Sequence, residues 1–93
     1  MRTYEAMCVF RADTDVFTRG KDAVRNELTK LDAKILKEED MGQRTLAYPI
    51  KTETQGHYFY FVAEMDPEKA HQAPASVELL DELLRFMVVR QES

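Results

Sequence analysis

The residues that could carry out chemistry are few and widely separated along this sequence. Cys8 is the only cysteine, and His57 and His71 are the only histidines. These residues do not form a metal-binding spacing such as Cys-x-x-Cys or His-x-x-x-His. The three glycines stand at positions 20, 42 and 56 and are too scattered to form a phosphate-binding loop. The sequence therefore predicts no metal, no cofactor and no nucleophilic catalyst.

One run of acidic residues, Glu38-Glu39-Asp40, places several carboxylates close together. Carboxylates act as general acids or bases where burial or neighbouring charges shift their pKa values. A consecutive acidic run in a polar stretch is more typical of a solvated surface segment. We therefore expect that the protein is not an enzyme.

Arginine and tyrosine side chains offer another chemistry, because arginine can bind phosphate through two hydrogen bonds and tyrosine can stack on an unpaired base. Seven basic or aromatic residues on the predicted strands are our candidates for RNA contact: Arg2, Tyr4, Arg44, Tyr48, Lys51, Arg85 and Arg90. The formal net charge of −4 argues against binding of nucleic acid by overall charge. Any RNA contact is therefore expected to be local, or to be shared with a basic partner.

The composition is that of one small globular domain. The 93 residues are 44% hydrophobic and 32% charged, and no apolar run approaches the ~20 residues of a membrane span. The N-terminal segment Met1-Arg2-Thr3-Tyr4-Glu5 lacks the apolar stretch and cleavage site of a signal peptide. A single cysteine excludes an internal disulfide and suits a reducing compartment. We expect one domain over residues 1–93, located in the cytoplasm.

Four segments have the alternation or the residue types of strands, namely residues 2–11, 34–50, 57–65 and 85–91. Gly42 predicts a bend or bulge in the second of them. Pro49 lacks an N–H group for a strand ladder, so this second strand is expected at a sheet edge. The polar residues 52–56, which end in glycine, are predicted to form the connection of a hairpin.

Two helices separate these strands. The first is predicted to begin at Asp13-Thr14-Asp15 and to present Phe17, Val24, Leu28 and Leu31 on one stripe. Gly20 lies in this stripe at a cost of about 1 kcal/mol relative to alanine. The second helix is predicted to begin at Asp66-Pro67-Glu68, with aspartate as the cap and proline at the first helical position. Pro74 predicts a break or kink, after which the helix should resume through Val77, Leu80 and Leu84.

This order of elements, βαββαβ, predicts an α+β protein with the ferredoxin-like fold. The fold has one four-stranded antiparallel sheet with the strand order 4-1-3-2 and two helices on one face. The same topology is found in the small acylphosphatases, whose phosphate site needs an asparagine on a neighbouring strand. The only asparagine here, Asn26, lies in the first predicted helix, so the likeness ends at the topology.

Two helices cover only one face of such a sheet, yet three of the strands are apolar on both faces. The second set consists of Met7 and Val9, of Tyr58, Tyr60 and Val62, and of Met87 and Val89. An apolar patch of this size is typical of an interaction surface, and tyrosine suits such a place. We expect Met7, Val9, Tyr58, Tyr60 and Val62 to bind a partner. The alternative is a small-ligand-binding regulatory module that homodimerises through the open face of its sheet.

Four segments resemble the bacterial small-subunit ribosomal protein six family, in the order and spacing of that family. They are Met1-Arg2-Thr3-Tyr4-Glu5, Gly42-Gln43-Arg44-Thr45-Leu46-Ala47-Tyr48-Pro49-Ile50, Gly56-His57-Tyr58-Phe59-Tyr60 and Leu84-Arg85-Phe86-Met87-Val88-Val89. The second segment, with the pattern G-x-R-x-L-A-Y-P-I, is the most specific, and the resemblance extends over nearly the whole chain.

The resemblance implies the ferredoxin-like fold and a structural role in the 30S subunit. It further implies pairing with small-subunit ribosomal protein eighteen and binding of the pair to the central domain of 16S ribosomal RNA during assembly. Arg2, Tyr4, Arg44 and Tyr48 stand in the matching motifs and are expected at the RNA or at the partner. Pro74 departs from the family, many of whose members have an unbroken second helix.

Overall fold

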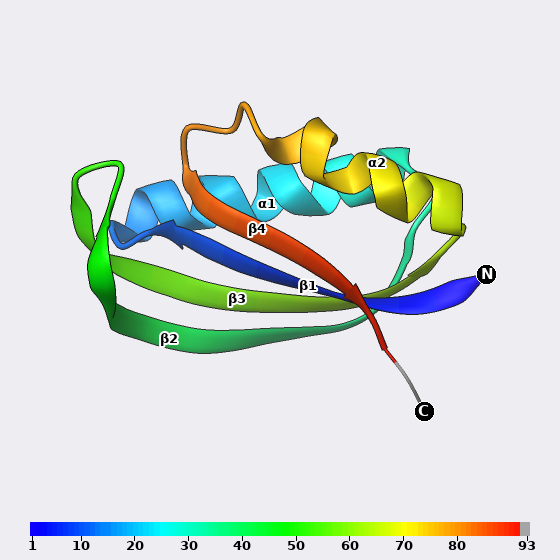
Figure 1. The fold of residues 1–93 in the computed structure, drawn as a ribbon, viewed down its shortest axis with the longest axis horizontal. Helices are drawn as coiled ribbons and strands as arrows, with labels where there is room; N and C mark the ends of the chain where they lie inside the picture. Colours follow the sequence, from blue (N-terminus) through cyan, green and yellow to red (C-terminus); the bar gives the residue numbers. More distant parts are fainter. Residues whose placement is uncertain (92–93) are drawn as a thin grey trace.

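Six elements follow one another in the predicted order (Figure 1). They are β1 (Arg2–Arg11), α1 (Thr14–Lys30), β2 (Lys34–Ile50), β3 (Glu53–Met65), α2 (Pro67–Val77) and β4 (Leu83–Arg90). The computed structural model describes residues 1–91, so the last two residues of the predicted domain, Glu92 and Ser93, lie outside the described residues.

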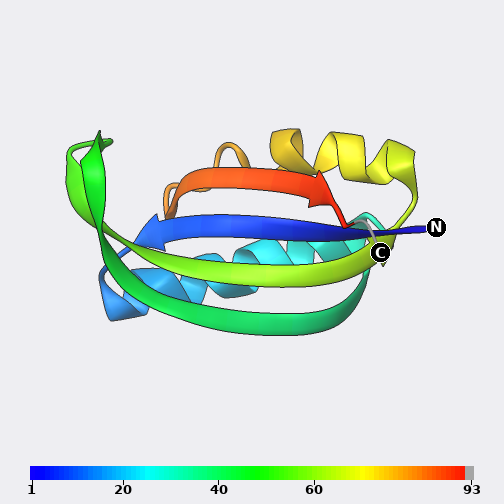
Figure 2. The same ribbon diagram turned by 60° about the horizontal axis from the view of Figure 1, so that its bottom comes forward.

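All pairs of neighbouring strands are antiparallel, and their order across the sheet is β2-β3-β1-β4 (Figure 2). This is the predicted order 4-1-3-2 counted from the other edge. Both helices lie on the same face of the sheet (Figure 1). The prediction of a ferredoxin-like fold is therefore confirmed.

Helix α1 begins as the sequence predicts. The side chain of Asp13 accepts hydrogen bonds from the backbone N–H groups of Asp15 and Val16, at 3.0 and 3.1 Å. These bonds satisfy two of the N–H groups that a helix leaves unpaired at its start. The predicted stripe faces the sheet, where Phe17, Val24 and Leu28 are buried.

Gly20 lies where α1 packs tightly against Phe10 of β1 and Glu82 of the segment before β4. A Cβ atom on Gly20 would stand 2.7 Å from Cδ1 of Phe10 and 2.7 Å from Cβ of Glu82. Any side chain at this position would separate the helix from the sheet. Close packing therefore accounts for a glycine in the middle of a helix, where it lowers the intrinsic stability of the helix.

Helix α2 corrects one prediction. Asp66 and Pro67 occupy the predicted positions at its start, although the side chain of Asp66 makes no capping hydrogen bond. Pro74 lies inside the helix without ending it, and α2 continues to Val77. The helix does not resume afterwards, because Leu80 lies in a turn and Leu84 lies in β4. Leu80 and Leu84 have the spacing of a helical stripe, but neither residue is helical.

The connection between β2 and β3 is also shorter than predicted. The turn consists of Lys51 and Thr52, whose φ angles are 49° and 67°. Two consecutive residues with positive φ are the mark of a type I′ hairpin turn, which usually contains asparagine or glycine. Gly56 is not part of this turn but lies in β3, where a Cβ atom would come within 2.5 Å of Cγ1 of Val9.

Strand β2 is an irregular edge strand, as Gly42 and Pro49 predicted. The register of its pairing with β3 shifts between Asp40 and Gly42, and Gly42 has a φ of +83°. A larger irregularity follows, because the pair Thr45–Gln55 is succeeded by the pair Ile50–Glu53. Residues 46–49 therefore have no regular place in the ladder, and Pro49 interrupts no hydrogen bond there.

The hydrophobic core lies between the helices and the sheet. Its fully buried side chains come from both helices and from the central strands, and the largest are Phe10, Phe61, Leu28, Met65, Val24, Val77 and Cys8. Burial raises the pKa of the Cys8 thiol well above its ordinary value. Cys8 is therefore a small apolar residue of the core in this protein and not a reactive thiol.

Candidate partner and RNA interface

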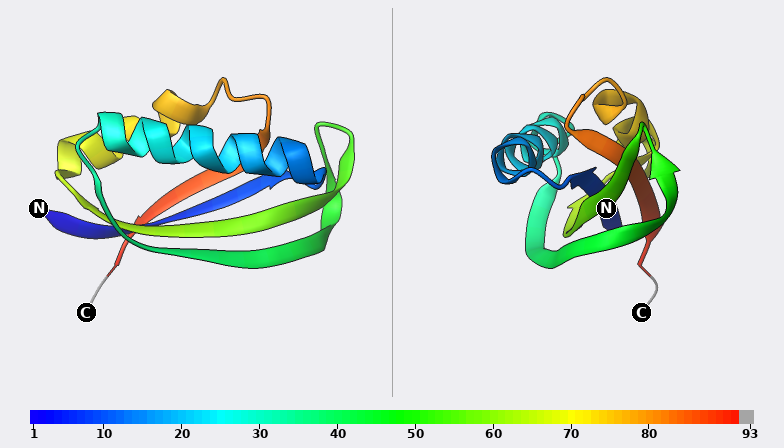
Figure 3. Two further views of the ribbon diagram at one scale, coloured as in Figure 1. Left: turned by 180° about the vertical axis from the view of Figure 1, so that it is seen from behind. Right: turned by 90° about the vertical axis from the view of Figure 1, so that its left-hand side faces the viewer.

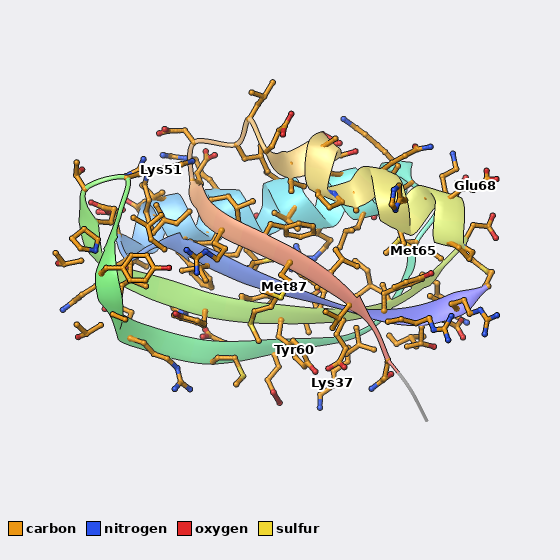
Figure 4. The ribbon with its side chains drawn as sticks, in the orientation of Figure 1. Lys37, Lys51, Tyr60, Met65, Glu68 and Met87 are labelled. Carbon is orange, nitrogen blue, oxygen red and sulfur yellow. The ribbon has the colours of Figure 1, made fainter. Side chains whose placement is uncertain are left out.

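An apolar strip crosses the face of the sheet that the helices leave open. Its members come from the three strands β1, β3 and β4, where Met7 is paired with Tyr60 on one side and with Met87 on the other. Met87 is 54% exposed and Val89 is 48% exposed. We call Met7, Tyr60, Met87 and Val89 the open-face strip. Figure 4 shows Tyr60 extending away from the sheet on the side opposite to the helices.

Charged and apolar residues frame this strip. Glu39 of β2 stands opposite Tyr60, and Glu5 of β1 stands between Val62 and Val89. Together with Met41 they line a shallow hollow over the strip. An apolar centre with a polar border is the usual anatomy of a protein–protein interface. The geometry of this face therefore suits a macromolecular partner better than a small substrate.

The chain itself covers one end of the open face. The hairpin between β2 and β3 bends out of the plane of the sheet (Figure 3). Its residues Leu46, Tyr48 and Ile50 help to line a hollow of about 220 Å³ together with Val9 and Tyr58. As a result, the expectation that the whole second face is uncovered holds only for the part that lies away from the hairpin.

The five residues predicted to bind a partner are not equally accessible. Met7, Tyr58 and Tyr60 are half-buried, so they offer surface to another molecule. Val9 is only 4% exposed and Val62 only 8% exposed. These two valines lie beneath the surface and can support an interface but contribute little contact area to it.

Four of the seven RNA candidates lie together around the hairpin. Arg85 donates a hydrogen bond from Nη2 to the hydroxyl oxygen of Tyr48 at 3.3 Å, and this bond lowers the pKa of the Tyr48 hydroxyl. The guanidinium carbon of Arg44 lies 5.8 Å from the centre of the Tyr58 ring. Lys51 donates from Nζ to the carbonyl oxygen of Leu83 at 3.1 Å and thereby ties the hairpin to the start of β4 (Figure 4).

The other three candidates, Arg2, Tyr4 and Arg90, lie at the opposite end of the sheet. Arg2 is paired with Met65 and Tyr4 with Arg90, whereas the hairpin is near the other end of β1. Arg85 and Arg90 are five residues apart on β4, about 17 Å at ~3.4 Å per residue, whereas Arg2 and Arg44 lie near opposite ends of β1, about 30 Å apart. No single short RNA segment would contact all seven side chains.

Tyr4 requires a correction. Its ring belongs to the core on the helix side of the sheet and is only 9% exposed. Stacking on a base would require Tyr4 to leave this core, so we remove it from the proposed RNA contacts. The alternation of β1 contained the signal, because Tyr4 shares its parity with the buried residues Ala6, Cys8 and Phe10.

Sequence reasoning missed three residues of this face. Met41 borders the open-face strip, and Leu46 and Ile50 cover its hairpin end. Alternation in β2 identified Leu46 and Ile50 as apolar residues of a strand. It did not predict that an irregular edge strand would bend and bring them over the sheet.

The residues with catalytic potential have structural partners instead. Nε2 of His57 lies 2.6 Å from Oδ1 of Asp40, and the imidazole ring stacks on Phe17 with 3.6 Å between ring centres. The hydrogen bond from His57 lowers the pKa of Asp40. Arg25 of α1 donates two hydrogen bonds to Glu38, at 2.6 and 2.8 Å, and these bonds lower the pKa of Glu38. The Arg25–Glu38 pair fastens edge strand β2 to helix α1, and the Asp40–His57 pair fastens β2 to β3.

Residues 1–91 contain no group of three or more histidine, cysteine or acidic side chains that could hold a metal ion. In the same part of the chain, no helix is both long enough and apolar enough to cross a membrane.

Comparison with protein-family models gives a match to the family described as "Ribosomal protein S6", over residues 3–90. The chain belongs to the ribosomal protein S6 family. The resemblance found in the sequence is thus confirmed. S6 proteins are structural, non-enzymatic components of the 30S subunit, so this chain is a ribosomal protein of the bacterial cytoplasm and not an enzyme.

Curated S6 relatives match the chain over its whole length. The small ribosomal subunit protein bS6 of Treponema pallidum (strain Nichols) is 41% identical over 93 residues and covers 100% of both chains. The bS6 protein of Treponema denticola is 38% identical over 92 residues and covers 99% of both chains. The Thermus thermophilus protein is 29% identical over 94 residues, covering 99% of this chain and 93% of the relative.

A solved S6 structure supports the fold. The crystal structure of 30S ribosomal protein S6 from Thermotoga maritima superposes with a TM-score of 0.85 at 24% sequence identity, covering 97% of this chain and 87% of that chain. At this level of identity the likeness concerns the arrangement of the backbone.

Proposed function

We propose that this S6-family chain binds the central domain of 16S ribosomal RNA together with small-subunit ribosomal protein eighteen, and so supports assembly of the 30S subunit. The observation that carries the proposal is the open-face strip, where Met87 and Val89 are about half exposed beside Met7 and Tyr60. Burial of an exposed apolar strip of this kind against another macromolecule is energetically favourable.

The charge of the chain supports a shared RNA site. A protein with a net charge of −4 gains little from long-range attraction to phosphate. A basic partner seated on the open face would bring positive charge next to Arg44 and Arg85, which lie around the hairpin end of the same face. The chain would then supply a few local phosphate contacts, and its partner would supply most of the electrostatic attraction.

The partner contact can be tested with the substitution Tyr60→Glu, which places a charge in the centre of the open-face strip. We expect cooperative unfolding to persist, because Tyr60 is only half-buried, and binding to the purified partner to weaken strongly. Leu79→Glu is the matched control, since Leu79 is 92% exposed in the segment between α2 and β4. Equal affinities of both variants in calorimetric titrations would refute the open-face contact.

The RNA contact can be tested with Arg44→Ala. We expect this substitution to weaken binding of a central-domain RNA fragment, and to do so chiefly in the presence of the partner. Loss of one phosphate contact should also reduce the slope of log K against log salt by about 1. The control is Arg19→Ala on α1, at the helix side of the molecule. An unchanged filter-binding curve and salt slope for Arg44→Ala would count against a phosphate contact at this residue.

The alternative of a homodimeric regulatory module predicts a different state in solution. A monomer that becomes a dimer only when the basic partner is added supports the ribosomal proposal. Light scattering that shows a stable homodimer, joined through its open face and saturable by a metabolite, would support the regulatory module instead.

A further inference from the structure

The two edges of the sheet differ in their readiness to accept another strand. On the β2 edge, the pairing register shifts near Leu36 and Met41, and residues 46–49 have no ladder positions. This edge also carries Pro49 and the charged run that begins at Lys37. Bulges, proline and charge are the features that protect an edge strand from pairing with other chains. The β2 edge is therefore poorly suited to pair with an additional strand.

Over residues 85–90 the β4 edge lacks proline and bulges, and its charged residues, Arg85 and Arg90, stand only at the two ends. The strand contains no proline, and its only register shift lies near Leu84 at its start. The backbone N–H of Gln91 donates to the carbonyl of Thr3 at 2.9 Å. Because hydrogen-bonded pairs alternate in an antiparallel ladder, Val89, Met87 and Arg85 face β1 with their backbone groups.

The backbone groups of the alternate residues Phe86, Val88 and Arg90 then point away from β1. None of them forms a hydrogen bond with another backbone or side-chain group among residues 1–91. They form a row of free donors and acceptors about 14 Å long, at ~3.4 Å per residue. Such a row is a template for an added strand.

Two hollows lie beside this row, between β4 and helix α2. One of about 390 Å³ is lined by Val88 and, from α2, by Ala70, His71 and Pro74. The other, of about 250 Å³, is lined by Phe86 and, from α2, by Pro74. Phe86 and Val88 are two residues apart, so the hollows have the spacing of alternate side chains on a neighbouring strand.

We propose that the outer edge of β4 binds an extended segment of another protein as a fifth strand, with apolar side chains at positions i and i+2 entering the two hollows. Main-chain hydrogen bonds would give the affinity, and the hollows beneath α2 would select the side chains. This surface lies at the edge of the sheet, so the inference does not depend on the partner contact proposed for the open face.

Charge further defines the segment. Lys51 and Arg85 line the hollow beside Phe86 together with Glu78, and Arg90 stands at the end of the row. These three cations outnumber the single carboxylate, so opposite charge on a bound segment is favoured next to them. The bound segment should therefore carry an aspartate or glutamate beside its apolar pair. A second copy of this chain fits less well, because two molecules with a net charge of −4 repel each other.

The probe for this proposal is a capped octapeptide in which two valines, separated by one threonine, are flanked by glutamates. It is titrated into the full-length protein while backbone amide resonances are followed by NMR. We expect saturable shifts, with hydrogen-exchange protection gained at Phe86, Val88 and Arg90 but unchanged at Met87 and Val89. Shifts confined to the open-face strip, or no saturation at millimolar peptide, would overturn the proposal.

Two controls separate strand addition from other binding. The same peptide with alternate amides N-methylated cannot form the ladder and should not bind. Val88→Pro removes one outward N–H group that has no partner in the chain, so it should fold and weaken binding by about 2- to 10-fold, the equivalent of one hydrogen bond. Equal binding of the methylated peptide would refute the inference. Because Tyr60→Glu should leave peptide affinity unchanged, failure here is distinguishable from failure of the open-face proposal.

Discussion

Replacing Gly20 by alanine should destabilise the protein, although the same change stabilises most helices. In an unconstrained helix interior, Gly→Ala is worth about 1 kcal/mol in favour of alanine. Here the new methyl group would stand 2.7 Å from a ring carbon of Phe10 and 2.7 Å from Cβ of Glu82. Phe10 is fully buried and packs edge-on against Phe17, so its ring has no free space into which to move.

Overpacking of this kind costs about 1–3 kcal/mol. Subtracting the gain in helix propensity leaves an expected loss of about 1 kcal/mol in the free energy of unfolding. Urea denaturation measures this loss, and for a domain of this size the melting temperature should fall by about 4–8 °C. Asn26→Ala is the control, because Asn26 is exposed on the same helix and alanine should be slightly stabilising there. If Gly20→Ala is as stabilising as this control, the close approach of α1 to β1 does not exist.

Three further predictions concern the hairpin and the edge strand. Thr52→Gly should stabilise the protein by about 0.5–1 kcal/mol, measured by thermal melting, because Thr52 has a φ of 67° that glycine adopts without strain; a lower melting temperature would contradict this. Asp40→Asn should destabilise the protein near neutral pH and lose this effect in acid, since the lowered pKa of Asp40 contributes stability that is complete above the unfolded-state pKa and is lost as the pH falls through the folded-state pKa; a difference from the native protein that stays constant in urea titrations down to strongly acidic pH would argue against the His57 bond. Lys51→Met should raise hydrogen-exchange rates of residues 46–52 by about 2- to 10-fold, because the bond to Leu83 is lost, and unchanged rates would show that this bond does not hold the hairpin.

Local patterns were sufficient to predict most of the fold. Ala6, Cys8 and Phe10 share one parity on a central strand, and all three are buried in the core as this parity predicts. Asp13 is followed directly by a helix because its carboxylate satisfies the first N–H groups. In both cases, residues close in sequence determine the structure.

The errors arose where a local pattern had two interpretations. Leu80 and Leu84 continue the spacing of a helix, but α2 ends at Val77 and these leucines belong to a turn and to β4. The turn at Lys51 and Thr52 lacks glycine and asparagine, so its positive φ angles had no signal in the sequence.

The candidate site was predictable in part for the same reason. Alternation placed Tyr60 and Met87 on the face opposite to the helices, and the structure places them there. It could not show that Leu46 and Ile50 would bend over Val9, because this depends on an irregularity in β2 that spans residues 46–49. The covered and the uncovered parts of the face were distinguishable only in three dimensions.

The buried thiol of Cys8 makes the native protein its own reporter of unfolding. The sulfur lies on a central strand beneath both helices, and burial keeps it protonated and inert. A maleimide dye can react with it only when β1 separates from its neighbours. The rate of alkylation would therefore report how often the sheet opens. A strand or subunit that binds the sheet and hinders its opening would lower this rate.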